Sequence, residues 1–240
     1  MATQITSDLL ANGGGLTLNE TPSSTKLGCR AVSNDGREYR YALAGGTALV
    51  VGKLQQSAAE ITNHQDLTPT AAAAIAATSI TVTLGNTAAT ANYYAGGFAL
   101  ITTSTGVGYM YRIASNPAAN ASATIVLTLD DAITIATATS SRVDLYPSPY
   151  QSVIVNPTTA SSAPVGVAIS AITNAQYGWI QTKGISNVLM DGTGVVGTAQ
   201  VASNAVAGAV EPLTGVQAAV GTLLTGVADQ QYGAILLNLA

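Results

Sequence analysis

One short stretch of the chain matches a cofactor-binding motif. Residues 192–197 read Gly-Thr-Gly-Val-Val-Gly, which fits the G-x-G-x-x-G pattern of dinucleotide-binding loops, and Glu211 stands about 20 residues further on, where that motif expects an acidic residue. In a βαβ unit a helix and a second strand must lie between the third glycine and the acidic residue. The segment from Gly197 to Glu211 is too short to hold both. We therefore interpret the stretch as a glycine-rich turn at Asp191-Gly192 followed by a strand.

The chain contains a single histidine, His64, and a single cysteine, Cys29. A serine or cysteine hydrolase normally uses histidine as its general base, so His64 would have to serve any such reaction. It lies in a polar stretch, shortly before Asp66, and the chain has no nucleophile elbow. We therefore expect His64 to lie on the surface. One histidine and one cysteine are too few for a zinc site, and one cysteine excludes an internal disulfide.

Asp130 and Asp131 form the only directly adjacent pair of acidic residues. In a strand neighbouring side chains point to opposite faces, so the pair is poorly placed for acid–base catalysis and instead favours a turn after Leu129. A calcium site that combines these carboxylates with loop carbonyls remains open, because calcium accepts oxygen ligands flexibly. From these residues we predict no catalytic site, cofactor or metal. We expect that the protein is not an enzyme and that it binds no small-molecule substrate.

The composition is unusual in its charge. Hydrophobic residues make up 48% of the 240 residues, but charged residues make up only 8%, where about 25% is usual. Because charged residues are depleted at the cores of protein interfaces, this composition favours a surface that is partly buried against other subunits. A neutral, hydroxyl-rich soluble surface is the alternative. The net charge is −4 with scattered Lys and Arg, so we expect no nucleic-acid partner, and no apolar run is long enough to predict a membrane span.

Period-two alternation of apolar residues dominates the pattern from residue 79 onward and predicts an all-β fold. One short alanine-rich helix is predicted after Pro69, ending by about Thr78, because proline is tolerated in the first turn of a helix. The predicted strands lie at Thr47–Leu54, Ser79–Leu84, Phe98–Thr103, Val107–Ile113, Thr124–Leu129, Ile133–Ala138, Arg142–Tyr146, Ser152–Val155, Val165–Ile172, Tyr177–Lys183, Ile185–Met190, Val195–Val201, Ala205–Val210, Val220–Val227 and Tyr232–Leu239.

Five residues are candidates for interaction. Residues 1–36 are polar and rich in glycine, and they are predicted to form an extended arm on a neighbouring subunit or a mobile tail, with Leu16 and Leu18 as its apolar contacts. After the Asp35-Gly36 turn, Tyr39 and Tyr41 fall on one strand face. Trp179 is the only tryptophan and lies in the Tyr177–Gly184 strand, so it is expected either at the centre of the core or at an interface.

Two blocks and the C-terminal region resemble a known protein family. Residues 36–65 (GREYRYALAGGTALVVGKLQQSAAEITNHQ) and 163–184 (APVGVAISAITNAQYGWIQTKG) are similar to head decoration, or cement, proteins of tailed bacteriophages. With the later Val195-Val196-Gly197 and Ala207-Gly208-Ala209-Val210 patterns, the resemblance covers about half of the chain. Such proteins are β-barrel or tulip-like modules, often trimeric, that bind the outer capsid surface where capsomers meet. The family has no catalytic residues.

The resemblance implies a domain organisation and a set of partners. Residues 1–36 would be the arm, 37–68 and 151–240 together the core module, and 69–150 an inserted β-rich domain that contains the alanine-rich helix. The expected partners are the major capsid protein and further copies of the chain in a homotrimer. The expected location is the capsid surface of the virion, after synthesis in the host cytoplasm. A tail-fibre or receptor-binding β module of a virion is the alternative.

Overall fold

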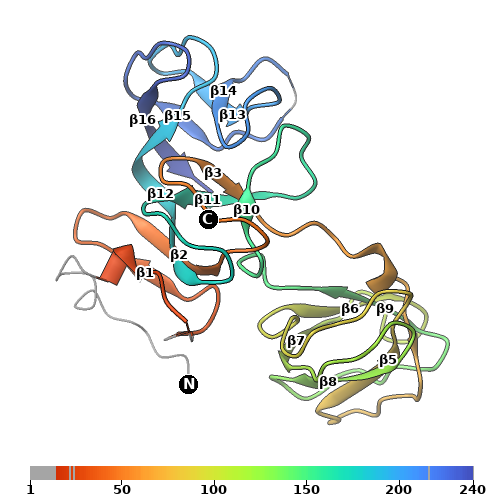
Figure 1. Cartoon of the computed structure of the whole chain (residues 1–240). Helices are drawn as coiled ribbons and strands as arrows, with labels where there is room; N and C mark the ends of the chain where they lie inside the picture. The colour runs from red at the N-terminus through yellow and green to blue at the C-terminus, as the bar shows by residue number, and fades with distance from the viewer. Residues whose placement is uncertain (1–14, 22, 24, 216, 240) are drawn as a thin grey trace. The chain divides into compact units, whose positions relative to one another are not determined.

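The computed structural model describes residues 15–21, 23, 25–215 and 217–239, so the start of the predicted arm, residues 1–14, lies outside it. The chain forms two compact units (Figure 1). Unit 1 comprises the described residues of Met1–Ala59 and Pro149–Ala240, and unit 2 comprises Glu60–Ser148. The sequence placed the boundaries at 68/69 and 150/151, whereas the structure places residues 60–68 in unit 2. The all-β prediction is confirmed.

Unit 1 is one curled antiparallel sheet built around its longest strand, β12 (Tyr177–Leu189). The first half of β12 pairs with β2, and its second half pairs with β16, which comes from the C-terminal end of the sequence (Figure 1). The other strands of this unit are β1 (Arg30–Val32), β2 (Glu38–Leu43), β3 (Leu54–Gln56), β10 (Ile154–Val155), β11 (Pro164–Ala168), β13 (Ala199–Ala202), β14 (Val210–Pro212), β15 (Gly221–Leu223) and β16 (Tyr232–Asn238).

Strand β12 contributes to different apolar clusters from its two faces. Ile180 packs in one cluster of aliphatic side chains, and Val188 packs in a second one. Trp179, the neighbour of Ile180, points to the opposite face of the strand and packs in a separate aromatic cluster. Two strands predicted from the sequence, Tyr177–Lys183 and Ile185–Met190, are therefore one continuous strand, in which Gly184 (φ +88°) provides the bend between them.

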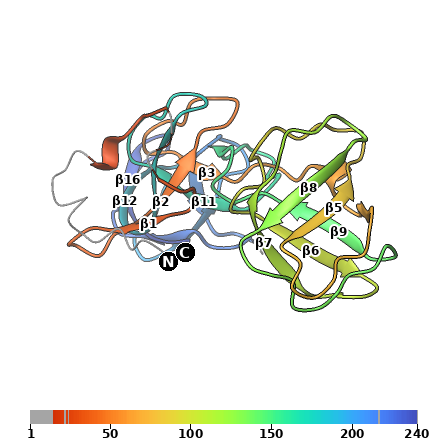
Figure 2. The same cartoon turned by 90° about the horizontal axis from the view of Figure 1, so that it is seen from below.

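Unit 2 is a six-stranded antiparallel sheet that closes on itself. The path runs β4, β5, β8, β7, β6, β9, and reciprocal backbone hydrogen bonds between Leu67, just before β4, and Val143 of β9 close the ring. The strands curve around a common interior (Figure 2). Buried aliphatic and tyrosine side chains fill this interior. The strands are β4 (Thr68–Pro69), β5 (Ser79–Thr83), β6 (Phe98–Thr103), β7 (Met110–Ser115), β8 (Thr124–Leu129) and β9 (Arg142–Tyr146).

The predicted alanine-rich helix is wrong. Residues 70–78 contain no helical turn, and Ala76 has φ +70°, which a right-handed helix does not allow. The backbone groups of this segment bond to other parts of the barrel instead: Ala76 donates to Ile133 O at 2.8 Å, and Ala73 O accepts from Thr137 N at 2.9 Å. Alanine has the highest helix propensity, but propensity is a weak determinant that tertiary contacts override. These long-range hydrogen bonds and the packing of Ala73 and Ala77 on the barrel core therefore decide the conformation.

The described part of the predicted N-terminal arm also differs from expectation. The described residues of this segment pack on their own chain: β1 pairs with β2, Gly28 N donates to Tyr41 O at 2.8 Å, and Glu20 and Tyr177 bond each other through their backbones. A short 3-10 helix, η1 (Gly15–Thr17), leads into this segment. Low apolar content therefore did not prevent docking, because a few half-buried side chains suffice when a preformed sheet supplies the partner strands.

The predicted strand Thr47–Leu54 is wrong for most of its length. The chain turns at Val51-Gly52, where Gly52 has φ +71°, and β3 begins only at Leu54.

Within the described residues, no helix is long and apolar enough to cross a membrane.

Candidate docking surface and its surroundings

The structure brings all five predicted interaction residues into one aromatic cluster of unit 1. Tyr39, Tyr41 and Trp179 form its buried centre with exposed fractions of 0%, 0% and 2%, and Leu16 and Leu18 are half-buried against them. Tyr41 and Trp179 are directly opposite each other in the β2–β12 register, and their rings meet edge to face at 5.2 Å. The three aromatic residues are therefore core residues of their own unit and do not offer a contact surface.

Several polar groups around this cluster are paired within the chain, whereas the buried Tyr39 hydroxyl has no hydrogen-bond partner among the described residues. The Tyr41 hydroxyl donates to the Glu20 carboxylate, and the Tyr177 ring stacks on Tyr41 at 5.7 Å. At the far end of β2, Arg30 and Glu38 form an ion pair at 2.7 Å, and Lys183 lies 3.8 Å from the same carboxylate. The hydrogen bond from Arg30 lowers the pKa of Glu38 most, with a further contribution from the charge of Lys183.

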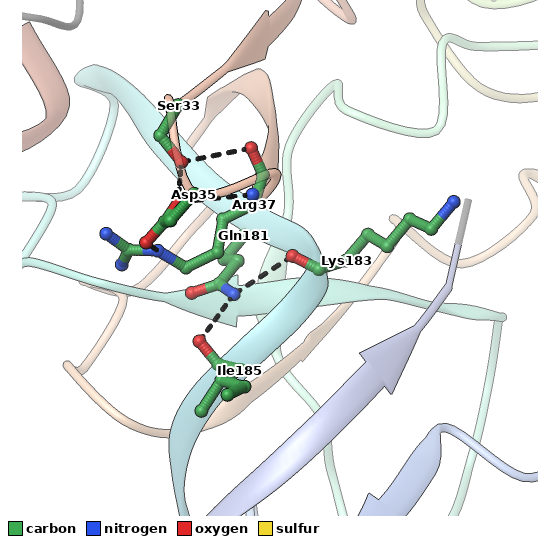
Figure 3. Close-up of polar contacts among 6 residues, drawn as sticks. All are labelled: Ser33, Asp35, Arg37, Gln181, Lys183 and Ile185. Atoms are coloured by element: carbon green, nitrogen blue, oxygen red, sulfur yellow. Dashed lines mark hydrogen bonds and ion pairs between the residues drawn. The ribbon is translucent and has the colours of Figure 1, made fainter.

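The β1–β2 turn carries an exposed polar network close to β12 (Figure 3). The Ser33 hydroxyl donates to the Asp35 carboxylate, and Arg37 Nε donates to the same group at 2.7 Å. The pKa of Asp35 is lowered to about 2, chiefly by the hydrogen bond from Ser33 and then by Arg37. The predicted Asp35-Gly36 turn is confirmed, with Gly36 at φ +81° and β1 and β2 paired on either side.

Beneath this turn, a side chain of β12 bonds to the backbone of its own strand. Gln181 is 1% exposed, and its Nε2 donates to Lys183 O at 3.0 Å and to Ile185 O at 2.9 Å (Figure 3). Both carbonyls thus accept from one buried amide group. The hydrogen bonds fix the bend at Gly184 and hold the next residues of β12 in position.

The second half of β12 and its partner β16 present an exposed apolar face, which we call the docking face. In the register, Ile185 lies directly opposite Leu236, and these two side chains are 56% and 47% exposed. Tyr232, also on β16, is 46% exposed, and Val51 of the adjoining turn is 51% exposed. Unlike isolated surface hydrophobics, these four side chains occur together on one sheet surface, which is typical of an interaction site.

Two grooves flank Ile185. One has a volume of about 490 Å³ and lies between the Val51-Gly52 turn, Tyr232 and the Arg37 side chain. The other, of about 640 Å³, lies between the Asp35-Gly36 turn and strands β15 and β16. Volumes of this order suit a small ligand or the side chains of a partner protein. An apolar centre with polar groups around it is the usual build of a protein interface.

The burial of β12 changes along its length. A β-bulge between Gln181 and Lys183 interrupts the pairing with β2, so the alternation of side chains in the first half of the strand does not continue in phase into the second half. In the first half, Leu16, Leu18 and Leu27 of the N-terminal segment pack over the cluster that contains Trp179. In the second half, the side chains at 183, 185 and 187 are exposed.

His64 is not a surface residue, and this expectation is wrong. It lies in a 3-10 helix, η2 (Thr62–His64), and is 0% exposed in unit 2. Its Nε2 is 2.9 Å from Thr87 O, so this nitrogen must carry the proton and donate, and Nδ1 then accepts from the Tyr94 hydroxyl. Because both ring nitrogens bond to groups of the barrel, His64 holds the segment at the start of unit 2 against the barrel.

The other motifs occupy ordinary structural positions. Residues 192–197 form a loop in which Gly192 and Gly197 have positive φ, and the chain continues into β13 without a helix, so the glycine-rich turn interpretation is confirmed. Asp130 follows the end of β8 in a bend, as predicted, and is 3.4 Å from Arg112 Nε. Among the residues described, no three His, Cys, Asp or Glu side chains gather in a possible metal site.

Comparisons with known proteins give no assignment: no family model, no curated protein and no solved structure matches this chain.

The sequence pattern did not predict the docking face. Its residues alternate as in any strand, and only the pairing of residues 183–189 with 232–238 shows that Ile185 and Leu236 reinforce each other on the outer surface.

Proposed function

We propose that this protein is a structural component of a virion, a decoration protein that binds the outer capsid surface at capsomer junctions and stabilises the shell. The observation that carries the proposal is the docking face: an exposed apolar surface on unit 1 of a chain in which only 8% of the residues are charged. The resemblance of residues 36–65 and 163–184 to head decoration proteins supports the same role. We propose no catalytic role.

The mechanism is adhesion within a protein layer on the capsid. Each apolar contact that is removed from water contributes roughly 25 cal/mol per Å², from which the cost of immobilising the subunit must be subtracted. A small face such as that formed by Ile185, Leu236, Tyr232 and Val51 gives a weak single contact. Many weak contacts in a layer add up, because each bound copy raises the effective concentration of its neighbours. The major capsid protein and further copies of the chain are the partners in this proposal.

The test is the position and number of copies on the native particle. Electron cryo-microscopy should show two-unit density over the junctions between capsomers, and quantitative mass spectrometry of purified particles should give a copy number comparable to that of the major capsid protein. A protein absent from purified particles, or present only inside the shell, would contradict the proposal.

A second candidate function is a tail-fibre or receptor-binding module, favoured by one feature of unit 2. The hairpin that joins β6 to β7 exposes three large side chains close together in sequence, Val107, Tyr109 and Met110, at 57%, 44% and 57%. Such a tip could contact a cell-surface partner. The same copy-number measurement separates the two functions, because a tail component is present in only a few copies per particle.

A further inference from the structure

The docking face has opposite charges at its two ends. At the end where β12 leaves β2, Lys183 is 48% exposed, and Arg37 and Arg30 lie close by. Asp35 and Glu38 pair with these basic residues, which leaves this end with a net charge of +1 from three basic and two acidic groups.

The opposite end is acidic. Asp191 follows shortly after β12, Asp229 lies just before β16, and the two loops are joined by a hydrogen bond from Gly192 N to Asp229 Oδ1 at 2.7 Å. Asp229 is exposed, whereas Asp191 is half-buried and accepts from Ser203 Oγ at 2.5 Å. One basic residue, Lys53, follows the adjoining Val51-Gly52 turn. Its side chain packs against Gly208.

Between these ends the face carries no charge: its exposed side chains are the apolar Ile185 and Leu236, the polar Asn187, and Tyr232. Ile185 and Leu236 lie nearer the basic end, and Tyr232 lies nearer the acidic end, where it is paired in register with Leu189. From Lys183 to Leu189 the strand covers about 20 Å, at roughly 3.3 Å per residue. The charge pattern therefore runs basic, uncharged, acidic along one sheet surface.

We propose that the docking face binds the docking face of a second copy of this chain, related by a two-fold axis that brings Lys183 of each copy near Asp229 of the other. A partner of uniform charge would be attracted at one end of the face and repelled at the other. A second copy related by this axis is complementary at both ends, and it covers Ile185 and Leu236 with the same apolar residues. An interface that uses the same patch on both subunits is the common arrangement in homodimers.

The size of the face sets the strength of the pairing. Three neighbouring segments, β12, β16 and the Val51 turn, at about 4.8 Å spacing over about 20 Å of length, give roughly 300 Å² per copy. A standard stable interface buries about 800 Å² per partner, so the pair is expected to be weak and concentration-dependent. It is also expected to weaken as salt is added, because the terminal charges are exposed and screened. The pairing deepens the proposed function, on which it rests, by assigning the docking face to contacts between copies within the layer. It can be measured without capsids, so its failure is distinguishable from failure of the proposed capsid function.

The experiment is sedimentation equilibrium of the full chain at increasing concentration, with two charge-reversal variants. The wild-type protein should move from the 24.0 kDa monomer toward twice that mass. Lys183→Glu places acidic groups opposite each other at both ends, and Asp229→Lys places basic groups there, so each variant alone should raise the Kd at least about tenfold. An equimolar mixture of the two variants should recover dimers, because one end then pairs Glu with Lys and the other end keeps the natural pair.

Controls keep the result interpretable. Ile185→Arg tests the apolar centre independently of the Asp229 loop, and Val126→Arg, at a 43% exposed position of the barrel, should leave association unchanged. Circular dichroism verifies that each variant is folded. A wild-type chain that stays monomeric at its highest soluble concentration, a trimer instead of a dimer, or a mixture that does not recover association would overturn the two-fold pairing. Variants that lose only capsid binding would assign the face to the capsid instead.

Discussion

Replacing Trp179 by alanine should destabilise unit 1 severely. The side chain is 2% exposed, lies opposite Tyr41 across the β2–β12 pair and makes an edge-to-face contact with that ring at 5.2 Å. Burying a tryptophan removes up to about 250 Å² from water, which at roughly 25 cal/mol per Å² corresponds to at most about 6 kcal/mol. Partial collapse of the cavity recovers some of this. We therefore expect a loss of about 3–5 kcal/mol, a large part of the roughly 5–15 kcal/mol stability of a typical domain.

The assay must report on the two units separately, because each has its own core. Hydrogen exchange followed by mass spectrometry in increasing urea gives the unfolding free energy of individual peptides. Peptides from β2 and β12 should lose protection in Trp179→Ala, while peptides from the barrel strands β5 and β8 should keep theirs. Circular dichroism replaces tryptophan fluorescence as the global probe, because the variant removes the only tryptophan.

Tyr232→Ala is the matched control. It removes an aromatic side chain from the same sheet at a position that is 46% exposed, so its effect on unfolding should stay within about 0.5 kcal/mol. If Trp179→Ala costs less than about 1 kcal/mol, the packing assigned to the aromatic cluster is incorrect. Equal losses in both units would show that the units unfold cooperatively.

Two further predictions concern single polar groups. In Tyr94→Phe, His64 Nδ1 loses its buried donor, so unit 2 should lose about 1–3 kcal/mol, measured as a lower urea midpoint for barrel peptides only; an unchanged midpoint would contradict the assigned hydrogen bond. For Asp35, NMR titration should give a pKa of about 2, and Ser33→Ala should raise it toward the ordinary value of about 3.9. Because the folded pKa lies below the unfolded one, the contribution of Asp35 to stability is present above about pH 4 and is lost as the pH falls through about 2; a titration midpoint unaffected by Ser33→Ala would contradict the assigned cause.

The local pattern was sufficient for the strands whose faces differ clearly in polarity. Period-two alternation located β5, β8 and β16 nearly to the residue, because one face of each is buried and the other is exposed. The Asp35-Gly36 turn followed from the backbone freedom of glycine at positive φ. The spacing argument against a dinucleotide site was also correct, because a βαβ crossover has a minimum length that the segment between Gly197 and Glu211 does not reach.

Long-range contacts account for what the sequence did not predict. Residues 70–78 were assigned to a helix on alanine content, but their hydrogen bonds go to Ile133 and Thr137, far along the chain. His64 was placed on the surface from its polar neighbours, but Tyr94 and Thr87 enclose it from a segment that lies well beyond the reach of any local pattern. In each case the deciding partner is distant in sequence, and local propensity gives way to it.

The local sequence pattern also did not distinguish core residues from interaction residues, because buried and exposed residues alternate along one strand. Trp179 is the only tryptophan in the sequence, yet the N-terminal segment covers it almost completely. Ile185, further along β12, has an ordinary identity and is 56% exposed. The covering segment ends before Ile185, and the buried Gln181 amide holds the backbone there in place. Strand β12 thus has two roles: its first half builds the core that Trp179→Ala should disrupt, and its second half leaves the face that a second copy should cover.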